Sequence, residues 1–125
     1  MIKKIVAIFL FGLFLTGFFA CQKTTSDPIC SSYTCYIPNS FKPNGDGIDD
    51  YFSAKGTGIV TYEMWIYNAS GSQIFHTTNI NTPWDGRVQG GTINYCPEGV
   101  YTYTIKTTDE CSNTHTYTGE VILIN

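Results

Sequence analysis

Apolar and polar residues alternate along several stretches of the chain with a period of two, which is typical of half-buried β-strands. Residues 99–109, GVYTYTIKTTD, alternate most regularly. Their inward-facing side chains are expected to be Tyr101, Tyr103 and Ile105. Residues 58–69, GIVTYEMWIYNA, follow the same rule. Their core-facing side chains are expected to be Tyr62, Met64 and Ile66, with Trp65 and Tyr67 on the opposite face.

Turn-forming residues separate these strands and predict how they connect. The segment NASG, residues 68–71, interrupts the alternation before QIFHT, so residues 60–77 are expected to form a hairpin. A loop rich in Gly and Pro covers residues 82–91, and residues 114–125 contain a final strand. No helical period occurs after the first 20 residues. The sequence therefore predicts an all-β fold, a small antiparallel β-sandwich that is immunoglobulin-like.

The first 20 residues, MIKKIVAIFLFGLFLTGFFA, have the character of an export signal. Two lysines precede an apolar run of about 16 residues, which is shorter than the roughly 20 needed to span a bilayer. The end of this segment, GFFAC, resembles a bacterial lipoprotein signal, in which the cysteine becomes the lipidated first residue. We therefore expect a signal peptide over residues 1–20, a polar linker over 21–34 that starts at lipidated Cys21, and one domain over 35–125.

Charge excludes one class of function. Cleavage after residue 20 removes two of the seven basic residues and none of the ten acidic ones, which leaves a net charge of −5. Such an acidic chain lacks the positive patch that nucleic-acid binding requires. It also lacks a basic patch for anionic lipids, so membrane attachment is expected to depend on acyl chains.

Four cysteines remain besides Cys21, and export permits disulfides. They are Cys30, Cys35, Cys96 and Cys111. None has the close pairing of a zinc site, so structural bridges are expected. The strand between Cys96 and Cys111 would hold them roughly 30 Å apart, too far for a direct bridge. We expect Cys111 to pair with Cys35 or Cys30, and the partners of the other two cysteines stay open.

The segment FKPNGDGIDDYF, residues 41–52, has the composition of a calcium loop. Aligning Gly47 with the glycine of an EF-hand puts Lys42 at the first ligand position and Ser53 at the last, so it is not an EF-hand. A Ca²⁺ ion held in another geometry would use Asn44, Asp46, Asp49 and Asp50. The alternative is a structural turn in which the aspartates accept backbone hydrogen bonds. We expect the turn and no cofactor.

No catalytic arrangement is suggested by the sequence, and we expect no enzyme. There is no phosphate loop and no nucleophile elbow. Asp85, in the segment WDG, has no second acid at a suggestive spacing. We interpret it as part of an Asp-Gly turn beside a buried Trp84.

Five motifs taken together resemble a known family. In order, they are YIPNSFKPNGDGIDDYF, IYNASGSQIF, WDGRVQGG, GVYTYTI and a last strand ending VILI. This set resembles the gliding motility-associated C-terminal domain, the type B sorting domain of the type IX secretion system of Bacteroidota. The resemblance covers about residues 36–125. It implies a β-sandwich that passes through an outer-membrane translocon and is held by a barrel in that membrane.

The resemblance and the lipoprotein-type signal together lead to a functional hypothesis. A sorting domain normally follows a large cargo, whereas here a linker precedes it. We expect a lipid-tethered interaction module that docks on an outer-membrane β-barrel of the secretion or gliding machinery as an accessory or placeholder subunit. Its expected location is the outer membrane, at the cell surface rather than the periplasmic face. The alternative is a surface-displayed structural or adhesive lipoprotein.

The last strand is the expected docking element. It contains four consecutive apolar residues, Val121, Ile122, Leu123 and Ile124. Alternation sends only two of them into a core. The other two are either covered within the fold or meet a partner, which could add a strand to this edge. On this interpretation, deleting residues 121–125 should impair docking more than folding.

Overall fold

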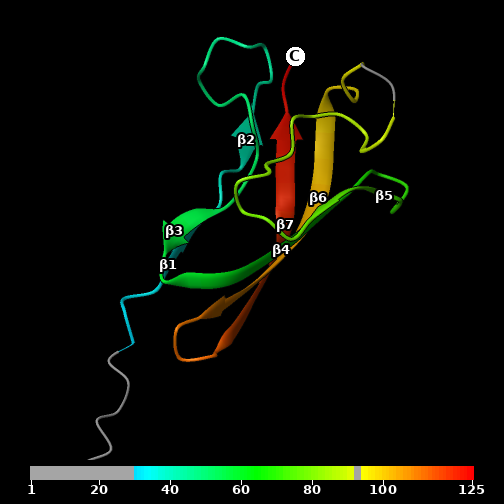
Figure 1. Cartoon of the computed structure of the whole chain (residues 1–125). Helices are drawn as coiled ribbons and strands as arrows, with labels where there is room; N and C mark the ends of the chain where they lie inside the picture. The colour runs from blue at the N-terminus through cyan, green and yellow to red at the C-terminus, as the bar shows by residue number, and fades with distance from the viewer. Residues whose placement is uncertain (1–29, 92–93) are drawn as a thin grey trace, which may run out of the picture.

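The computed structural model describes residues 30–91 and 94–125, and every regular element in these residues is a β-strand (Figure 1). The strands are β1 (Thr34–Tyr36), β2 (Ser40–Phe41), β3 (Lys55–Thr57), β4 (Ile59–Tyr67), β5 (Gln73–Thr77), β6 (Gly99–Asp109) and β7 (Thr114–Leu123). They form a five-stranded sheet in the order β2-β7-β6-β4-β5 and a two-stranded sheet of β1 and β3. The predicted all-β sandwich is confirmed.

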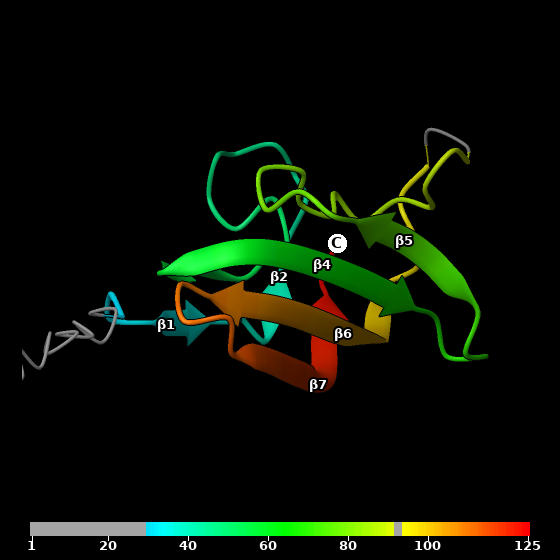
Figure 2. The ribbon, with the colours of Figure 1, turned by 60° about the horizontal axis from the view of Figure 1, so that its bottom comes forward.

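The strand pairs are antiparallel except for one. β2 runs parallel to the end of β7, and Ser40 and Phe41 lie opposite Ile122 and Leu123. β4 and β5 form the predicted hairpin, with an irregularity between Ile66 and Tyr67. The long segment after β5 and the segment before β3 lie over one face of the large sheet (Figure 2).

Alternation sets the faces of the central strands as predicted. In β4 and β6 the buried side chains occupy every second position, which is the consequence of the two-residue repeat of an extended chain. The fully buried members of these strands include Met64, Ile66 and Ile105. Tyr103 is partly buried, and Trp65 and Tyr67 lie on the opposite, half-exposed face.

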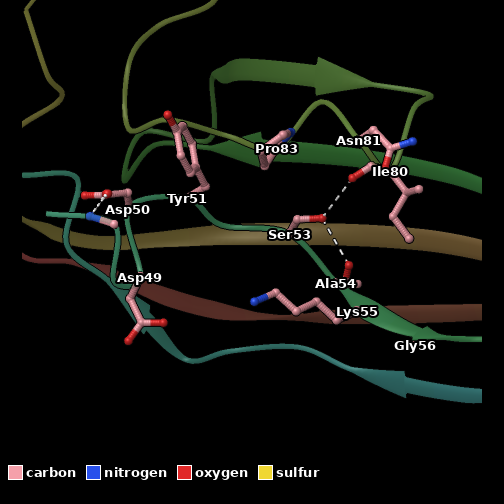
Figure 3. A pocket seen from close by; sticks show the side chains of 11 residues that line it. Asp49, Asp50, Tyr51, Ser53, Ala54, Lys55, Gly56, Ile80, Asn81 and Pro83 are labelled. Carbon is pink, nitrogen blue, oxygen red and sulfur yellow. Dashed lines mark hydrogen bonds between the residues drawn. The ribbon is translucent and has the colours of Figure 1, made fainter. Parts of the chain in front are cut away.

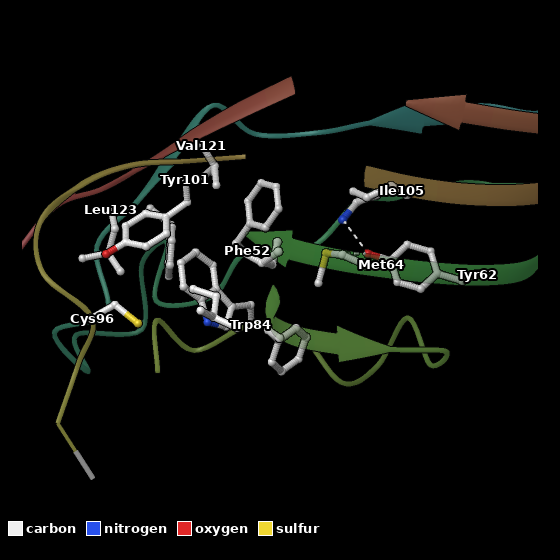
Figure 4. Packing of buried hydrophobic residues seen from close by; sticks show 14 residues of the cluster. Phe52, Tyr62, Met64, Trp84, Cys96, Tyr101, Ile105, Val121 and Leu123 are labelled. Carbon is white, nitrogen blue, oxygen red and sulfur yellow. Dashed lines mark hydrogen bonds between the residues drawn. The ribbon is translucent and has the colours of Figure 1, made fainter. Parts of the chain in front are cut away.

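The core contains residues from the five strands of the large sheet and from the loops between them (Figure 4). Trp84 is fully buried and lies between Phe41 and Tyr101, with ring centroids 5.1 and 5.2 Å away. The Trp84 indole Nε1–H donates to the backbone carbonyl of Arg87 at 2.8 Å, so its single polar group is satisfied inside the core. The predicted Asp-Gly turn beside a buried Trp84 is confirmed.

One disulfide joins the start of the described chain to the turn between β6 and β7. Cys30 and Cys111 are bridged, and their Cα atoms are 5.7 Å apart. This confirms one of the two expected pairings of Cys111. The expectation that Cys35 and Cys96 also form bridges is wrong, because both are free thiols. Cys96 is buried in the core, and this burial raises the pKa of its thiol and keeps it neutral.

Residues 30–34 belong to the folded domain, although the sequence placed them in the linker. The Tyr33 ring stacks on His115 with centroids 4.0 Å apart, and its hydroxyl hydrogen-bonds Thr107 Oγ1 at 2.7 Å. His115 also hydrogen-bonds Asp109 at 3.0 Å, which lowers the pKa of that carboxyl to about 2. The disulfide and the Tyr33 contacts therefore fix this segment against β6 and β7.

The predicted signal peptide, lipidated Cys21 and most of the predicted linker lie outside the described residues. Among residues 30–91 and 94–125, no helix has the length and hydropathy needed to cross a membrane.

Candidate functional site

Motifs that are far apart in the sequence meet at one end of the sandwich. The loop of residues 42–51 begins and ends at two core aromatic residues, Phe41 and Phe52, whose ring centroids lie 6.1 Å apart. Phe52 and Trp84 exchange backbone hydrogen bonds of 2.9 Å in both directions, which fixes the WDG turn beside this loop. Phe41 lies opposite Leu123 in the β2–β7 pair. The first, third and last motifs therefore form one unit.

Gly86 allows these three segments to approach closely. Its φ angle is +85°, a conformation that glycine adopts at little cost. A Cβ atom placed on Gly86 would lie 3.1 Å from Leu123 Cδ1 and 3.1 Å from Pro43 Cγ. The glycine of the WDG motif is therefore needed for both its backbone conformation and its lack of a side chain.

The carboxylates of the loop bind its own backbone. Asp50 accepts hydrogen bonds from the backbone N–H groups of Gly45 at 2.6 Å and Gly47 at 2.7 Å. Asp46 accepts from the Ile48 N–H at 2.8 Å, and this bond is the main reason that the pKa of Asp46 is lowered. Asn44 accepts from the Asp46 N–H at 3.0 Å. These are the bonds expected of a structural turn.

The structure does not gather the loop's acidic residues around one point. Asp49 forms part of the loop's sharp bend, with a φ angle of +50°. Within the described residues, no group of three or more His, Cys, Asp or Glu side chains has the arrangement of a metal site. The Ca²⁺ site suggested for Asn44, Asp46, Asp49 and Asp50 stays a hypothesis without geometric support.

A cavity of about 650 Å³ lies beside the loop (Figure 3). Its walls come from residues 47–56 and from the segment that contains Ile80 and Pro83. The Ser53 hydroxyl hydrogen is within reach of the carbonyls of Ala54 at 3.1 Å and Ile80 at 3.4 Å, and the contact with Ile80 joins the two walls. The buried polar group of this cavity is therefore already satisfied by the protein.

Arg87 and Asp85 are structural partners. Arg87 Nη1 donates to Asp85 Oδ2 at 3.1 Å, and the Arg87 N–H donates to Asp85 Oδ1 at 3.0 Å. The guanidinium also lies over the Tyr95 ring, 4.2 Å from its centroid. Both carboxylate oxygens of Asp85 are thus occupied within the turn, as its interpretation as a turn residue requires.

The four apolar residues at the end of the last strand alternate between the core and the solvent, as the sequence predicted. Val121 and Leu123 are fully buried, whereas Ile122 and Ile124 are 46% and 37% exposed. Two more exposed apolar residues, Ile48 and Tyr51, lie in the first-motif loop at the same end of the molecule (Figure 1). This end therefore presents apolar side chains to solvent from two different segments.

The edge of the last strand at residues 121–124 is already paired, contrary to the suggestion that a partner adds a strand there. The N–H groups of Ile122 and Ile124 donate to the carbonyls of Asn39 at 2.9 Å and Phe41 at 3.0 Å. Deleting residues 121–125 would also remove two core side chains, so we now expect it to impair folding. The docking hypothesis therefore has to rest on the exposed side chains of Ile122 and Ile124.

A comparison with known protein families agrees with the resemblance that the five motifs suggested. Residues 35–123 match the model of the CHU_C type IX secretion signal domain. The chain belongs to this family. Membership indicates a sorting-related role and a protein of the cell envelope or one that is secreted. A search of curated proteins finds no match.

Sequence reasoning missed how the motifs of this type IX secretion signal domain come together. It treated the first motif and the last strand separately, because the two-residue β2 is too short to show a period. The signal for this convergence was the pair of aromatic residues that bound the loop, Phe41 and Phe52. Both are buried, and the Phe41 ring packs on Phe52 and on Trp84.

Proposed function

We propose that this protein is a non-enzymatic, lipid-tethered interaction module, which docks on an outer-membrane β-barrel of the type IX secretion or gliding machinery as an accessory or placeholder subunit. The proposed location is the outer membrane, at the cell surface. The observation that carries the docking proposal is the end of the sandwich where three family motifs converge. Ile122 and Ile124 are exposed there, and the loop of residues 42–51 at the same end exposes Ile48 and Tyr51.

Rigidity makes this end suitable for recognition. The loop is held by the Asp50 bonds to Gly45 and Gly47, and the last strand is paired on both sides at Ile122. A partner would therefore meet apolar side chains that are already ordered and would lose little conformational entropy on binding. Exposed apolar side chains that gather at one end of a protein mark interaction sites, and Tyr is enriched among the residues that dominate binding.

The first described residue, Cys30, and the proposed docking surface lie at opposite ends of the domain (Figure 1). Cys30 is bridged to Cys111 in the β6–β7 turn, whereas the chain ends beside the first-motif loop (Figure 1). A lipid anchor upstream of Cys30 would therefore leave the docking end facing away from its point of attachment. This arrangement supports simultaneous tethering and docking.

Docking should fail when charge is placed on the exposed face of the last strand. The double variant Ile122→Lys with Ile124→Lys should reduce co-purification with an outer-membrane barrel about ten-fold or more, since desolvating two ammonium groups is costly. Both side chains are exposed, so folding should persist. The measurement is capture from detergent-solubilised outer membrane through a tag inserted after Lys23, with partners identified by mass spectrometry.

Val60→Lys is the matched control for this test. Val60 is 61% exposed and lies near the opposite end of β4, where Ile59 pairs with Asp109. This variant should keep the partner. Equal capture by the parent and the double variant would place docking elsewhere. A wild-type chain that captures no barrel, yet is displayed on intact cells, would favour the structural or adhesive lipoprotein.

Lipidation at Cys21 is tested separately. Cys21→Ser should leave a precursor that keeps residues 1–20, because the lipoprotein pathway requires the thiol of that residue. Intact mass and detergent partitioning measure both processing and lipid attachment. A processed, water-soluble Cys21→Ser protein would contradict the anchor while leaving the docking proposal open.

A further inference from the structure

The five-stranded sheet has two edges, and their outward backbone groups are hydrogen-bonded to different extents. At the β5 edge, the Gln89 N–H donates to the Ile74 carbonyl at 2.8 Å, and Gln89 Oε1 accepts from the His76 N–H at 2.9 Å. One glutamine thus occupies two of the outward backbone groups of this edge. Such covering prevents another strand from pairing there.

The β7 edge is covered only at its end. β2 pairs with Ile122 and Leu123 and extends no further back along the strand. The N–H groups of Ile122 and Ile124 point toward β2, so those of alternate residues in the same regular strand point the same way. These residues are Thr114, Thr116, Thr118 and Glu120. They are exposed, and nothing in residues 30–91 or 94–125 hydrogen-bonds their outward backbone groups.

We propose that a second copy of this chain pairs with this open edge. The two β7 strands would run antiparallel about a two-fold axis at Thr118. Thr118 would then lie opposite its counterpart, and Thr116 opposite Glu120 of the other copy. The result is one continuous sheet across two domains, a form of strand addition in which main-chain hydrogen bonds supply the attraction.

Charge selects this register among those that the open edge allows. β2 closes the edge at Ile122, and an axis at Thr118 pairs residues 116–120 of both copies. An axis at Tyr117 would extend the pairing to Thr114, but it would place Glu120 opposite Thr114 and away from Lys106, which lies beside Thr116. An axis at Glu120 would place two carboxylates directly opposite each other, which destabilises a strand pair. The axis at Thr118 instead places threonines, which favour extended structure, at the centre.

Charge also favours a second copy. Lys106 lies beside Thr116 in the β6–β7 pair, and both side chains are exposed on the same face. In the proposed dimer, Glu120 of the other copy lies on the far side of Thr116, two strand spacings or roughly 10 Å from Lys106. Both side chains are long enough to approach across the small threonine. The two-fold axis therefore brings Glu120 on β7 of one copy toward Lys106 on β6 of the other, a pair of opposite charges.

The interface would be small, so the dimer should be weak in free solution. Attachment of two copies to one membrane would raise their effective concentration and increase the dimer fraction. This inference does not depend on the proposed barrel, because it uses residues 116–120 and leaves Ile122 and Ile124 exposed.

Charge swapping at the axis gives the test. Thr118→Lys and Thr118→Glu each place like charges opposite each other in the dimer, so each variant alone should associate about two- to five-fold more weakly than the parent. An equal mixture should recover or exceed parental association, because the introduced lysine of one copy would face the introduced glutamate of the other. Sedimentation of the full chain in detergent measures association, and circular dichroism checks folding.

Cross-linking tests the register in the membrane. Thr118→Cys should give a covalent dimer with a short thiol cross-linker, whereas Thr102→Cys should not. Thr102 is exposed on the same face but lies within the sheet, between Tyr67 and Glu120. The parent chain controls for Cys35 and Cys96. A parent that stays monomeric up to millimolar concentration, a mixture that fails to recover association, or equal cross-linking at residues 102 and 118 would overturn the proposal.

Discussion

Removing the Cys30–Cys111 disulfide should lower the free energy of unfolding by about 4 kcal/mol. The bridged residues are 81 positions apart, so the bridge restricts most of the unfolded chain. A domain of this size has a total stability of only about 5–15 kcal/mol, and the loss would be a large part of it. The measurement is denaturant unfolding of the double variant Cys30→Ser with Cys111→Ser, followed by circular dichroism.

Cys35→Ser is the control for that variant. Cys35 is an unbridged, half-buried thiol, so the same substitution there should have a much smaller effect. In the double variant Cys30→Ser with Cys111→Ser, the segment that contains Tyr33 would lose its covalent attachment but keep its contacts with Thr107 and His115. A double variant whose free energy of unfolding equals that of the parent would show that these contacts hold the segment without the bridge.

Trp84→Ala should cost about 3–5 kcal/mol, which is the usual range for truncating a buried aromatic residue. Trp84 is fully buried, packs on Phe41 and Tyr101, and donates its indole N–H to the Arg87 carbonyl. Its backbone also pairs with that of Phe52, so the cavity would form where the three motifs meet. We expect a large fraction of the variant to be unfolded at physiological temperature. It should therefore also lose binding to the proposed outer-membrane barrel.

Trp65→Ala is the matched comparison, because it makes the same change on the other face of the sheet. Trp65 is half-buried and stacks on His76 with centroids 5.4 Å apart. We expect a loss of about 1 kcal/mol, the value of one aromatic contact. Circular dichroism in a urea titration compares the two variants. Equal losses would contradict the assignment of Trp84 to the centre of the core.

Local repetition explains which parts of this fold the sequence predicted well. β6 has the predicted bounds, residues 99–109, and the predicted alternation of faces. The β4–β5 hairpin and the split of the last strand into buried Val121 and Leu123 and exposed Ile122 and Ile124 follow from the same two-residue repeat. The Asp-Gly turn beside Trp84 was predicted from turn chemistry. Each of these features depends on residues that are neighbours in the chain.

The sequence by itself determined the fold class, the faces of the long strands and the family to which the five motifs belong. Only the tertiary structure decided that Cys30 and not Cys35 pairs with Cys111, that β2 closes the edge at Ile122, and that Gly86 packs against Leu123. The physical reason is distance along the chain. A strand shows its faces through the polarity of adjacent residues, whereas a disulfide or a strand pair joins residues that only packing brings together.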